Sequence, residues 1–256
     1  MEEYLGIFTK YIKDNYDTDN QLIRLKYFHS LEVAKLMLKL GKDLELNEED
    51  LNLALFIGLT HDLGRFYEIK NKGKMNNLTF DHGAYSVKIL YNDNLINRFN
   101  INESNSLIIK KALYFHGKKD INKNVNEREA LFCNLLRDAD KLDILRVVSE
   151  AKREFNELPT GYFIRNYMND LNLDLHFRKN RSDSVILYLS FIKDLFFNES
   201  YNYAIENKVL DNFIKMIDIS RDNQKLFDIL VNKVKKRGEE NVREKVRTLK
   251  RWRKQI

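Results

Sequence analysis

Apolar residues recur at every third or fourth position along most of this 256-residue chain. That spacing places them on one face of an α-helix, whereas a half-buried strand would need strict alternation. One Pro and nine Gly are few for this length, so little interrupts the helical pattern. The sequence therefore predicts an all-α protein, which is long enough to bury a substantial core.

The expected helices follow from these apolar stripes and from the polar residues that cap them, with Asn47 and Asp81 among the expected N-terminal caps. In the first part of the chain we expect helices over residues 2–15, 21–40, 47–62, 80–91, 102–116 and 127–155. Beyond Pro159 we expect helices near residues 162–171, 184–197, 200–217, 222–236 and 239–254. Segment 184–197 is rich in β-branched and aromatic residues, but its flanks favour a helix. Gly41 and Gly64 are expected to end helices, and residues 67–78 to form a loop.

Positive charge is concentrated at the C-terminal end. Residues 231–256, the basic tail, contain eleven Lys and Arg against three Glu, which gives +8, so residues 1–230 sum to −2 of the total of +6. Within this tail Val242, Val246 and Leu249 form a narrow apolar stripe. Such a helix could contact nucleic acid or an acidic membrane. The three glutamates favour a C-terminal helix packed on the body, with its basic residues solvated.

Several classes of protein are disfavoured. The single cysteine, Cys133, excludes an internal disulfide framework and a cysteine-based zinc site, and its apolar neighbours favour a small core residue. The first residues, Met1 to Tyr4, lack the basic-then-apolar layout of a signal peptide. Apolar runs fall short of the roughly 20 residues that span a bilayer. We therefore expect a cytoplasmic protein.

The most informative residues are a histidine and an aspartate at the end of an apolar helix. His61 and Asp62 follow the run from Leu51 to Leu59, and burying them is costly unless something pairs with them. A divalent metal ion would do so, although a helix-terminal His beside an exposed Asp is the simpler alternative. His29 lies on the buried stripe of its helix. Asp140 lies on an otherwise apolar helix face, where packing alone does not explain a carboxylate.

Two further histidines, His82 and His116, fall at helix ends, whereas His176 lies in a polar segment and is expected to be an ordinary polar residue. Neutral imidazole and carboxylate are the ligands that Zn, Mn, Fe or Ni accept. Successive candidates lie 32, 21, 34 and 24 residues apart, which is close to one helical hairpin each. That spacing suits ligands that project from facing helices into the core of a bundle.

These motifs resemble the HD-domain superfamily of metal-dependent phosphohydrolases. The pattern of that family is a lone His, then His-Asp, then a distant Asp, on a bundle of helices. Here they are His29 in FHSLEVA, His61-Asp62 in HDLGR and Asp140 in ADKLD. The resemblance covers about residues 22–150. It implies an HD-domain helical bundle in residues 1–155, with additional C-terminal helices in 156–256 packed on this core.

The resemblance also implies a metal site. One ion would be held by His29, His61, Asp62 and Asp140, and a second by Asp62, His82 and His116, with Asp62 as the bridge. His82 could instead be a capped helix-start residue, and His116 a histidine favoured by the helix dipole. We favour two ions over one. The metal, which could be Mn, Fe, Ni, Co or Zn, is not determined by such ligands.

The implied activity is hydrolysis of a phosphomonoester, a phosphodiester or a nucleotide by a metal-bound hydroxide. Asp62 would be central to catalysis, and Arg65 and then Lys118 are the preferred contacts for phosphate oxygens. Each of these two cations could equally be a solvated surface charge. Asp143 could orient a ligand histidine, whereas Asp138 is expected to face outward or to pair with a neighbouring cation.

Two other functions remain open. A minority of the superfamily uses the same dinuclear ligands for oxygen chemistry, which makes a di-iron oxygenase the second enzyme class. A nucleotide-binding or nucleic-acid-binding regulatory module is the non-enzymatic alternative, and the basic tail would then contact nucleic acid. The sequence does not specify the substrate or the oligomeric state.

Overall fold

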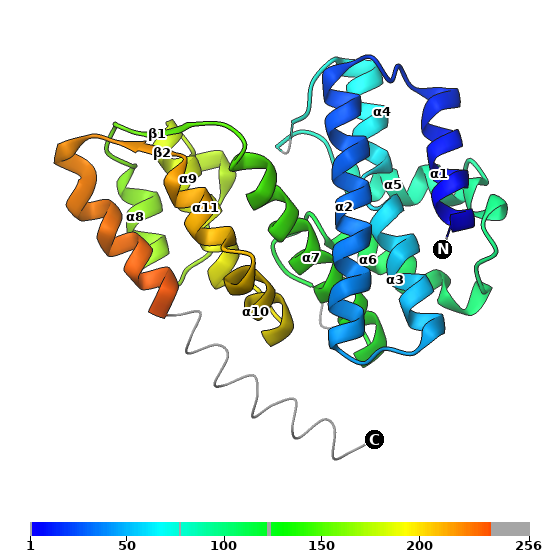
Figure 1. Ribbon diagram of the computed structural model, residues 1–256. Helices are drawn as coiled ribbons and strands as arrows, with labels where there is room; N and C mark the ends of the chain where they lie inside the picture. Colours follow the sequence, from blue (N-terminus) through cyan, green and yellow to red (C-terminus); the bar gives the residue numbers. More distant parts are fainter. Residues whose placement is uncertain (1, 77, 122–123, 237–256) are drawn as a thin grey trace. The chain divides into compact units, whose positions relative to one another are not determined.

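The structure, a computed structural model, describes residues 2–76, 78–121 and 124–236. Helices dominate these residues, which confirms the all-α prediction (Figure 1). The chain divides into two compact units, residues 1–140 and 141–256, and the division falls inside one long helix. The predicted organisation into a core of residues 1–155 and an extension of residues 156–256 stays a prediction.

The first unit is a helical bundle. Its helices are α1 (Glu2–Asn15), α2 (Gln21–Asp43), α3 (Glu48–Thr60), α4 (Leu63–Lys72), α5 (His82–Tyr91), α6 (Ser106–Phe115) and the first part of α7 (Glu127–Val148). The long helix α2 packs along α3, and α5 packs against both α4 and α6 (Figure 1). Fully buried side chains such as Met37, Phe56 and Phe66 fill the space between these helices.

Polar caps fix where several of these helices begin. The side chain of Asn47 accepts a hydrogen bond from the backbone N–H of Asp50, and Asp81 accepts one from Ala84. Both caps were expected from the sequence, because a side-chain oxygen at this position satisfies an N–H group that has no partner within the helix. Asp81 thereby sets the first residue of α5, which is His82.

The second unit combines short helices with two strands. Its elements are the end of α7, β1 (Arg153–Phe155), α8 (Gly161–Met168), α9 (Arg181–Lys193), α10 (Asn198–Glu206), α11 (Val209–Lys215), β2 (Ile217–Ile219) and a helical segment over residues 224–236. The strands pair in parallel, with Arg153 opposite Ile217 and Phe155 opposite Ile219. Helix α9 confirms that segment 184–197 is mainly helical rather than a strand.

Two predicted helix ends and one loop in the first unit are wrong. Helix α2 continues through Gly41 to Asp43, and a Cβ at Gly41 would lie 3.0 Å from Leu51, so this glycine serves close packing. Gly64 lies within α4. The segment 67–78 is helical as far as Lys72, because α4 buries Phe66 and Ile69, and it ends at Gly73 with a φ of 65°.

Two other predicted boundaries are wrong in the second unit. The helix expected over residues 127–155 ends at Val148, and its last residues instead form β1, which buries Phe155 against Phe227. The helix expected over residues 200–217 is broken at Lys208, which adopts a left-handed φ of 53°. The helix expected over residues 239–254, within the basic tail, lies outside the described residues.

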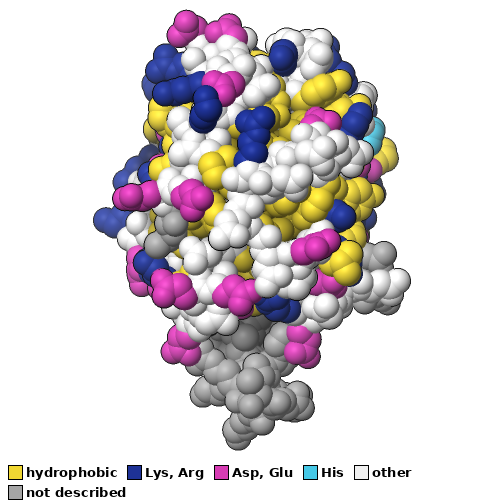
Figure 2. Space-filling view, turned by 90° about the vertical axis from the view of Figure 1, so that its right-hand side faces the viewer, with side chains coloured by type: hydrophobic (Ala, Val, Ile, Leu, Met, Phe, Trp, Pro, Cys, Tyr) yellow, Lys and Arg dark blue, Asp and Glu magenta, His cyan; other side chains and the backbone are white. Residues whose placement is uncertain are grey.

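No helix among the described residues is long and apolar enough to cross a bilayer. On the face shown in Figure 2, basic and acidic side chains are interspersed with apolar ones. This mixture of signs agrees with the near-neutral charge of residues 1–230. A face of this kind does not create the single-signed field that attracts polyanions.

Candidate metal centre

The sequence-predicted ligands lie on helices of the first unit or at the ends of these helices. His29 is on α2, His61 and Asp62 join α3 to α4, His82 begins α5, His116 follows α6, and Asp140 is on α7. The structure brings these side chains together in the interior of the bundle. Most are almost completely buried, with His61 at 0% exposure and His29 at 3%.

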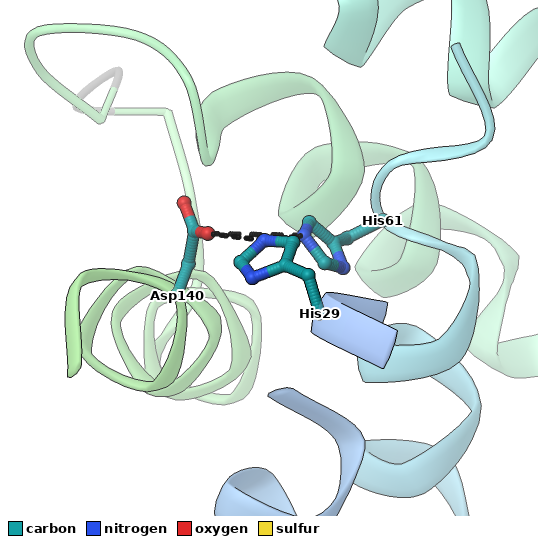
Figure 3. Close-up of side chains that lie close together, drawn as sticks. All are labelled: His29, His61 and Asp140. Carbon is teal, nitrogen blue, oxygen red and sulfur yellow. Dashed lines mark hydrogen bonds and ion pairs between the residues drawn. The ribbon is translucent and has the colours of Figure 1, made fainter. Parts of the chain in front are cut away.

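One group consists of His29, His61 and Asp140, whose ligand atoms face one another (Figure 3). The Nε2 atom of His29 lies 3.1 Å from Oδ1 of Asp140 and 3.3 Å from Nε2 of His61. The distance from His61 Nε2 to the same Asp140 oxygen is 3.8 Å. Two imidazole nitrogens and a carboxylate oxygen at such distances form a donor set that a transition-metal ion accepts.

A second group consists of His61, Asp62 and His116, with His82 beside it. Oδ1 of Asp62 lies 3.7 Å from Nε2 of His116 and 3.9 Å from Nε2 of His82. The rings of His82 and His116 are 4.7 Å apart between centroids. His61, Asp62, His82 and His116 thus surround a second point with ligand atoms. In the sequence, a second ion was indicated only by the family resemblance.

The carboxylate of Asp62 faces both groups. Its Oδ1 atom points to His82 and His116, whereas its Oδ2 atom lies 3.5 Å from Nε2 of His29 and 3.4 Å from Nε2 of His61. A carboxylate with one oxygen toward each group has the orientation that a bridging ligand needs. The residues present therefore fit two ions.

Backbone carbonyls fix the protonation of two histidines. Nδ1 of His61 donates to the carbonyl of Gly58 at 2.8 Å, and Nδ1 of His116 donates to that of Leu113 at 2.6 Å. Because a carbonyl only accepts, Nδ1 of each ring carries a proton, and when the ring is neutral its Nε2 presents a lone pair to the site. The buried Nε2 of His116 has no hydrogen-bond partner among the described residues. A buried lone pair of this kind is costly unless it accepts a hydrogen bond from water or binds a cation.

Electrostatics favour the ionic states that metal binding requires. Burial alone would raise the pKa of Asp62, but Lys26 and His61 outweigh it and hold that pKa well below its usual value. Burial would also raise the pKa of Asp140, but its hydrogen bond with His29 and the charges of His29, His61 and His116 together outweigh burial and lower that pKa. Burial lowers the pKa of His82, and His116 lowers it further. At neutral pH the carboxylates are ionised and His82 is neutral, as ligands must be.

These shifts predict that acid destabilises the metal-free protein. A histidine whose folded pKa is lowered costs stability once the unfolded chain binds a proton, below a pH of about 6.5. The lowered pKa values of Asp62 and Asp140 add a further loss near pH 4 and below, since their unfolded values are about 3.9. Denaturant unfolding of chelator-treated protein between about pH 7.5 and pH 4 measures this slope. His82→Gln should flatten the slope around pH 6, and an unchanged slope would contradict the assignment.

The two predicted phosphate contacts lie in different surroundings. Arg65 is buried and donates to Glu68 at 2.6 Å, and its charge contributes to the lowered pKa of His82. Lys118 is half-exposed and forms an ion pair with Asp81, the cap of α5. Contact with a substrate stays a prediction for both. Asp143, which belongs to the second unit, accepts hydrogen bonds from Arg146.

The structure also reveals residues that the sequence reasoning missed or misplaced. Lys26 donates to Oδ2 of Asp62 at 2.6 Å, and it precedes His29 by three positions, so helical spacing could have indicated it.

Asp138 was expected to face outward or to pair with a neighbouring cation, but it is only 1% exposed, so the outward placement is wrong. Glycines allow close approach: a Cβ at Gly117 would lie 2.7 Å from the ring of His82.

Arg137 was also missed, and it holds the segment that carries His116. Its guanidinium donates to the carbonyls of Phe115, Lys118 and Lys119 at 3.0, 2.5 and 3.0 Å. The carbonyl of Phe115 is at the C-terminal end of α6, where cations are favoured, and the other two are in the turn that follows. Arg137 therefore ties this end of α6 to α7, one turn before Asp140.

We expect Arg137→Met to lower the free energy of unfolding by about 2 kcal/mol, since charge-assisted hydrogen bonds are lost. Metal binding that depends on His116 should weaken as well. Denaturant unfolding and metal titration measure the two effects. Arg24→Met, at an exposed position of α2, is the matched control and should change neither. Equal stability of the two variants would show that Arg137 does not hold this segment.

The fold and the site define an all-α domain with a buried, candidate His/Asp metal centre. Residues 27–145 match the family model of the HD domain, a range that contains His29, His61, Asp62 and Asp140. This part of the chain is an HD domain. Comparisons with curated proteins and with solved structures found no match. An HD domain with these His/Asp groups indicates a metal-dependent, hydrolase-like function.

Proposed function

We propose that this protein is a metal-dependent phosphohydrolase that acts on a phosphomonoester, a phosphodiester or a nucleotide. The observation that carries the proposal is the position of Asp62, whose two oxygens face separate groups of histidines within an HD domain. Most HD domains belong to metal-dependent phosphohydrolases, which supports this reaction class. A divalent ion at such a site lowers the pKa of bound water toward neutrality and thereby supplies hydroxide.

The protein's own residues would prepare this chemistry. His29, His61 and Asp140 would bind one ion, and His82 and His116 the other, with Asp62 shared between them. The carbonyls of Gly58 and Leu113 hold two of these rings with Nε2 toward the site. Burial of the cluster strengthens its electrostatic interactions by keeping water away. Arg65 and Lys118 are proposed to bind phosphate oxygens.

The test begins with metal analysis of protein purified without chelator. Protein loaded with Mn, Fe, Ni, Co or Zn is then assayed for phosphate release from aryl phosphates, phosphodiesters and a panel of nucleotides. Hydrolysis that is lost on chelation and in Asp140→Ala would support the proposal. Failure of every metal-loaded form to hydrolyse any of these substrates would contradict it. A high iron content with substrate-dependent oxygen uptake would instead identify an oxygenase.

The partners also remain proposals. A small-molecule phosphate ester or nucleotide is the proposed substrate. Contact with nucleic acid through the basic tail stays a prediction, because residues 237–256 lie outside the described part of the chain. Salt-dependent binding of nucleic acid that is lost on truncation of residues 239–256 would support such a contact.

A further inference from the structure

Lys26 forms an ion pair with Asp62, a proposed metal ligand, but it has not yet been given a role in substrate binding. Its ammonium lies 2.6 Å from Oδ2 of Asp62, and its side chain is 15% exposed, whereas that of Asp62 is 3% exposed. Lys26 therefore reaches the buried carboxylate from a position that retains contact with solvent. A lysine is seldom placed so deeply unless an anion compensates its charge.

The same oxygen of Asp62 also faces Nε2 of His29 and of His61, at 3.5 and 3.4 Å. A metal ion held by these residues would compete with the ammonium for this oxygen. An ammonium and a metal ion bound to the same carboxylate oxygen would repel each other strongly in a buried site. Lys26 and the metal ion should therefore oppose each other's binding to Asp62.

Lys26 differs in this respect from the two cations predicted to contact phosphate. Arg65 pairs with Glu68, and Lys118 pairs with Asp81, so both have carboxylate partners outside the proposed ligand set. The carboxylate partner of Lys26 is itself a proposed ligand. Metal binding would therefore leave the Lys26 ammonium in need of a new anion. A flexible lysine is suited to meet a phosphate oxygen as a point charge.

We propose that Lys26 is the counter-ion of Asp62 in the metal-free protein and binds a phosphate oxygen of the substrate in the metal-loaded protein. This inference rests on the proposed function for its second half. It assigns Lys26 as a substrate contact that makes phosphate binding depend on metal binding. The two halves can be measured separately, because neither measurement requires hydrolysis.

The experiment compares the wild type with Lys26→Met, Lys26→Arg and Lys35→Met. Lys35 is on the same helix but exposed, and it pairs with Glu32 on the surface, so Lys35→Met is the matched control. Metal affinity is measured by titrating chelator-treated protein with Mn²⁺. Anion affinity is measured by titrating the Mn²⁺-loaded protein with inorganic phosphate. Circular dichroism establishes that each variant is folded.

Lys26→Met should bind Mn²⁺ roughly tenfold more tightly, because the competing charge is gone, and phosphate roughly tenfold more weakly. Lys26→Arg keeps the charge and should stay close to the wild type in both titrations, as should Lys35→Met. If Lys26→Met fails to fold, Lys26→Gln, which also removes the charge, takes its place and should show the same two changes; unchanged phosphate affinity in Lys26→Gln would overturn the substrate role.

Unchanged or weaker Mn²⁺ binding by folded Lys26→Met would overturn the counter-ion role. Phosphate binding that is equal in Lys26→Met and the wild type, or absent from the wild type, would overturn the substrate role. If Lys26→Met shows both changes in affinity but the wild type has no phosphohydrolase activity, only the proposed function is contradicted.

Discussion

Asp62→Asn is expected to abolish metal binding at both groups. Asparagine keeps the shape of the side chain but removes the negative charge that faces four histidines, and its amide nitrogen cannot donate a lone pair to a metal ion. Metal affinity should fall by at least ~100-fold, since even the loss of an outer partner of a ligand costs 10-fold to 100-fold. Phosphate release, if the proposed function holds, should become undetectable.

Comparison with a second ligand variant tests whether Asp62 is shared. His116→Gln removes a ligand from one group only, so it should lose one ion and retain the other, whereas Asp62→Asn should lose both. Elemental analysis after gel filtration measures the number of ions per chain. Asp43→Asn removes an exposed carboxylate that pairs with Lys39 at the end of α2, and it should bind metal as the wild type does. Retention of one ion by Asp62→Asn would show that its carboxylate does not bridge the groups.

The helices that could be predicted are those whose signals are local. The apolar spacing of α2 placed His29 on the buried side, and the structure shows it 3% exposed. Asn47 and Asp81 were expected as caps because capping needs only the residues of one helical turn. His29, His61, Asp62 and Asp140 were found for a related reason: histidine and aspartate at apolar positions are conspicuous without knowledge of the neighbours. His82 and His116 were named as ligands only through the family resemblance.

The predictions that failed depend on partners distant in the sequence. Gly41 and Gly64 have the local signature of helix ends, yet both lie within helices and serve the close approach of other segments. Strands β1 and β2 have three residues each and pair across more than sixty positions, so no local pattern indicates them. Lys26 and Arg137 resemble ordinary surface cations until the fold shows what they contact.

Gly64→Ala is expected to lower the free energy of unfolding strongly, although it adds only one methyl group. A Cβ at Gly64 would overlap the carbonyl oxygen of His82 and lie 2.9 Å from its carbonyl carbon. Both are backbone atoms, so a side-chain rotation cannot relieve the clash, and the start of α5 must move. The hydroxyl of Ser86, which accepts from the N–H of Gly64 and donates to the carbonyl of His61, would be displaced too.

We expect the free energy of unfolding to fall by about 3 kcal/mol or more, at the upper end of the cost of overpacking a core. The number of bound ions should fall as well, because His82 moves away from Asp62. Gly6→Ala is the matched control: Gly6 lies in α1, and a Cβ there would meet nothing within 4 Å, so alanine should stabilise that helix by up to ~1 kcal/mol. The same substitution should therefore change stability in opposite directions at the two sites. Equal effects in denaturant unfolding would mean that helix propensity, and not the approach of His82 to Gly64, determines the outcome.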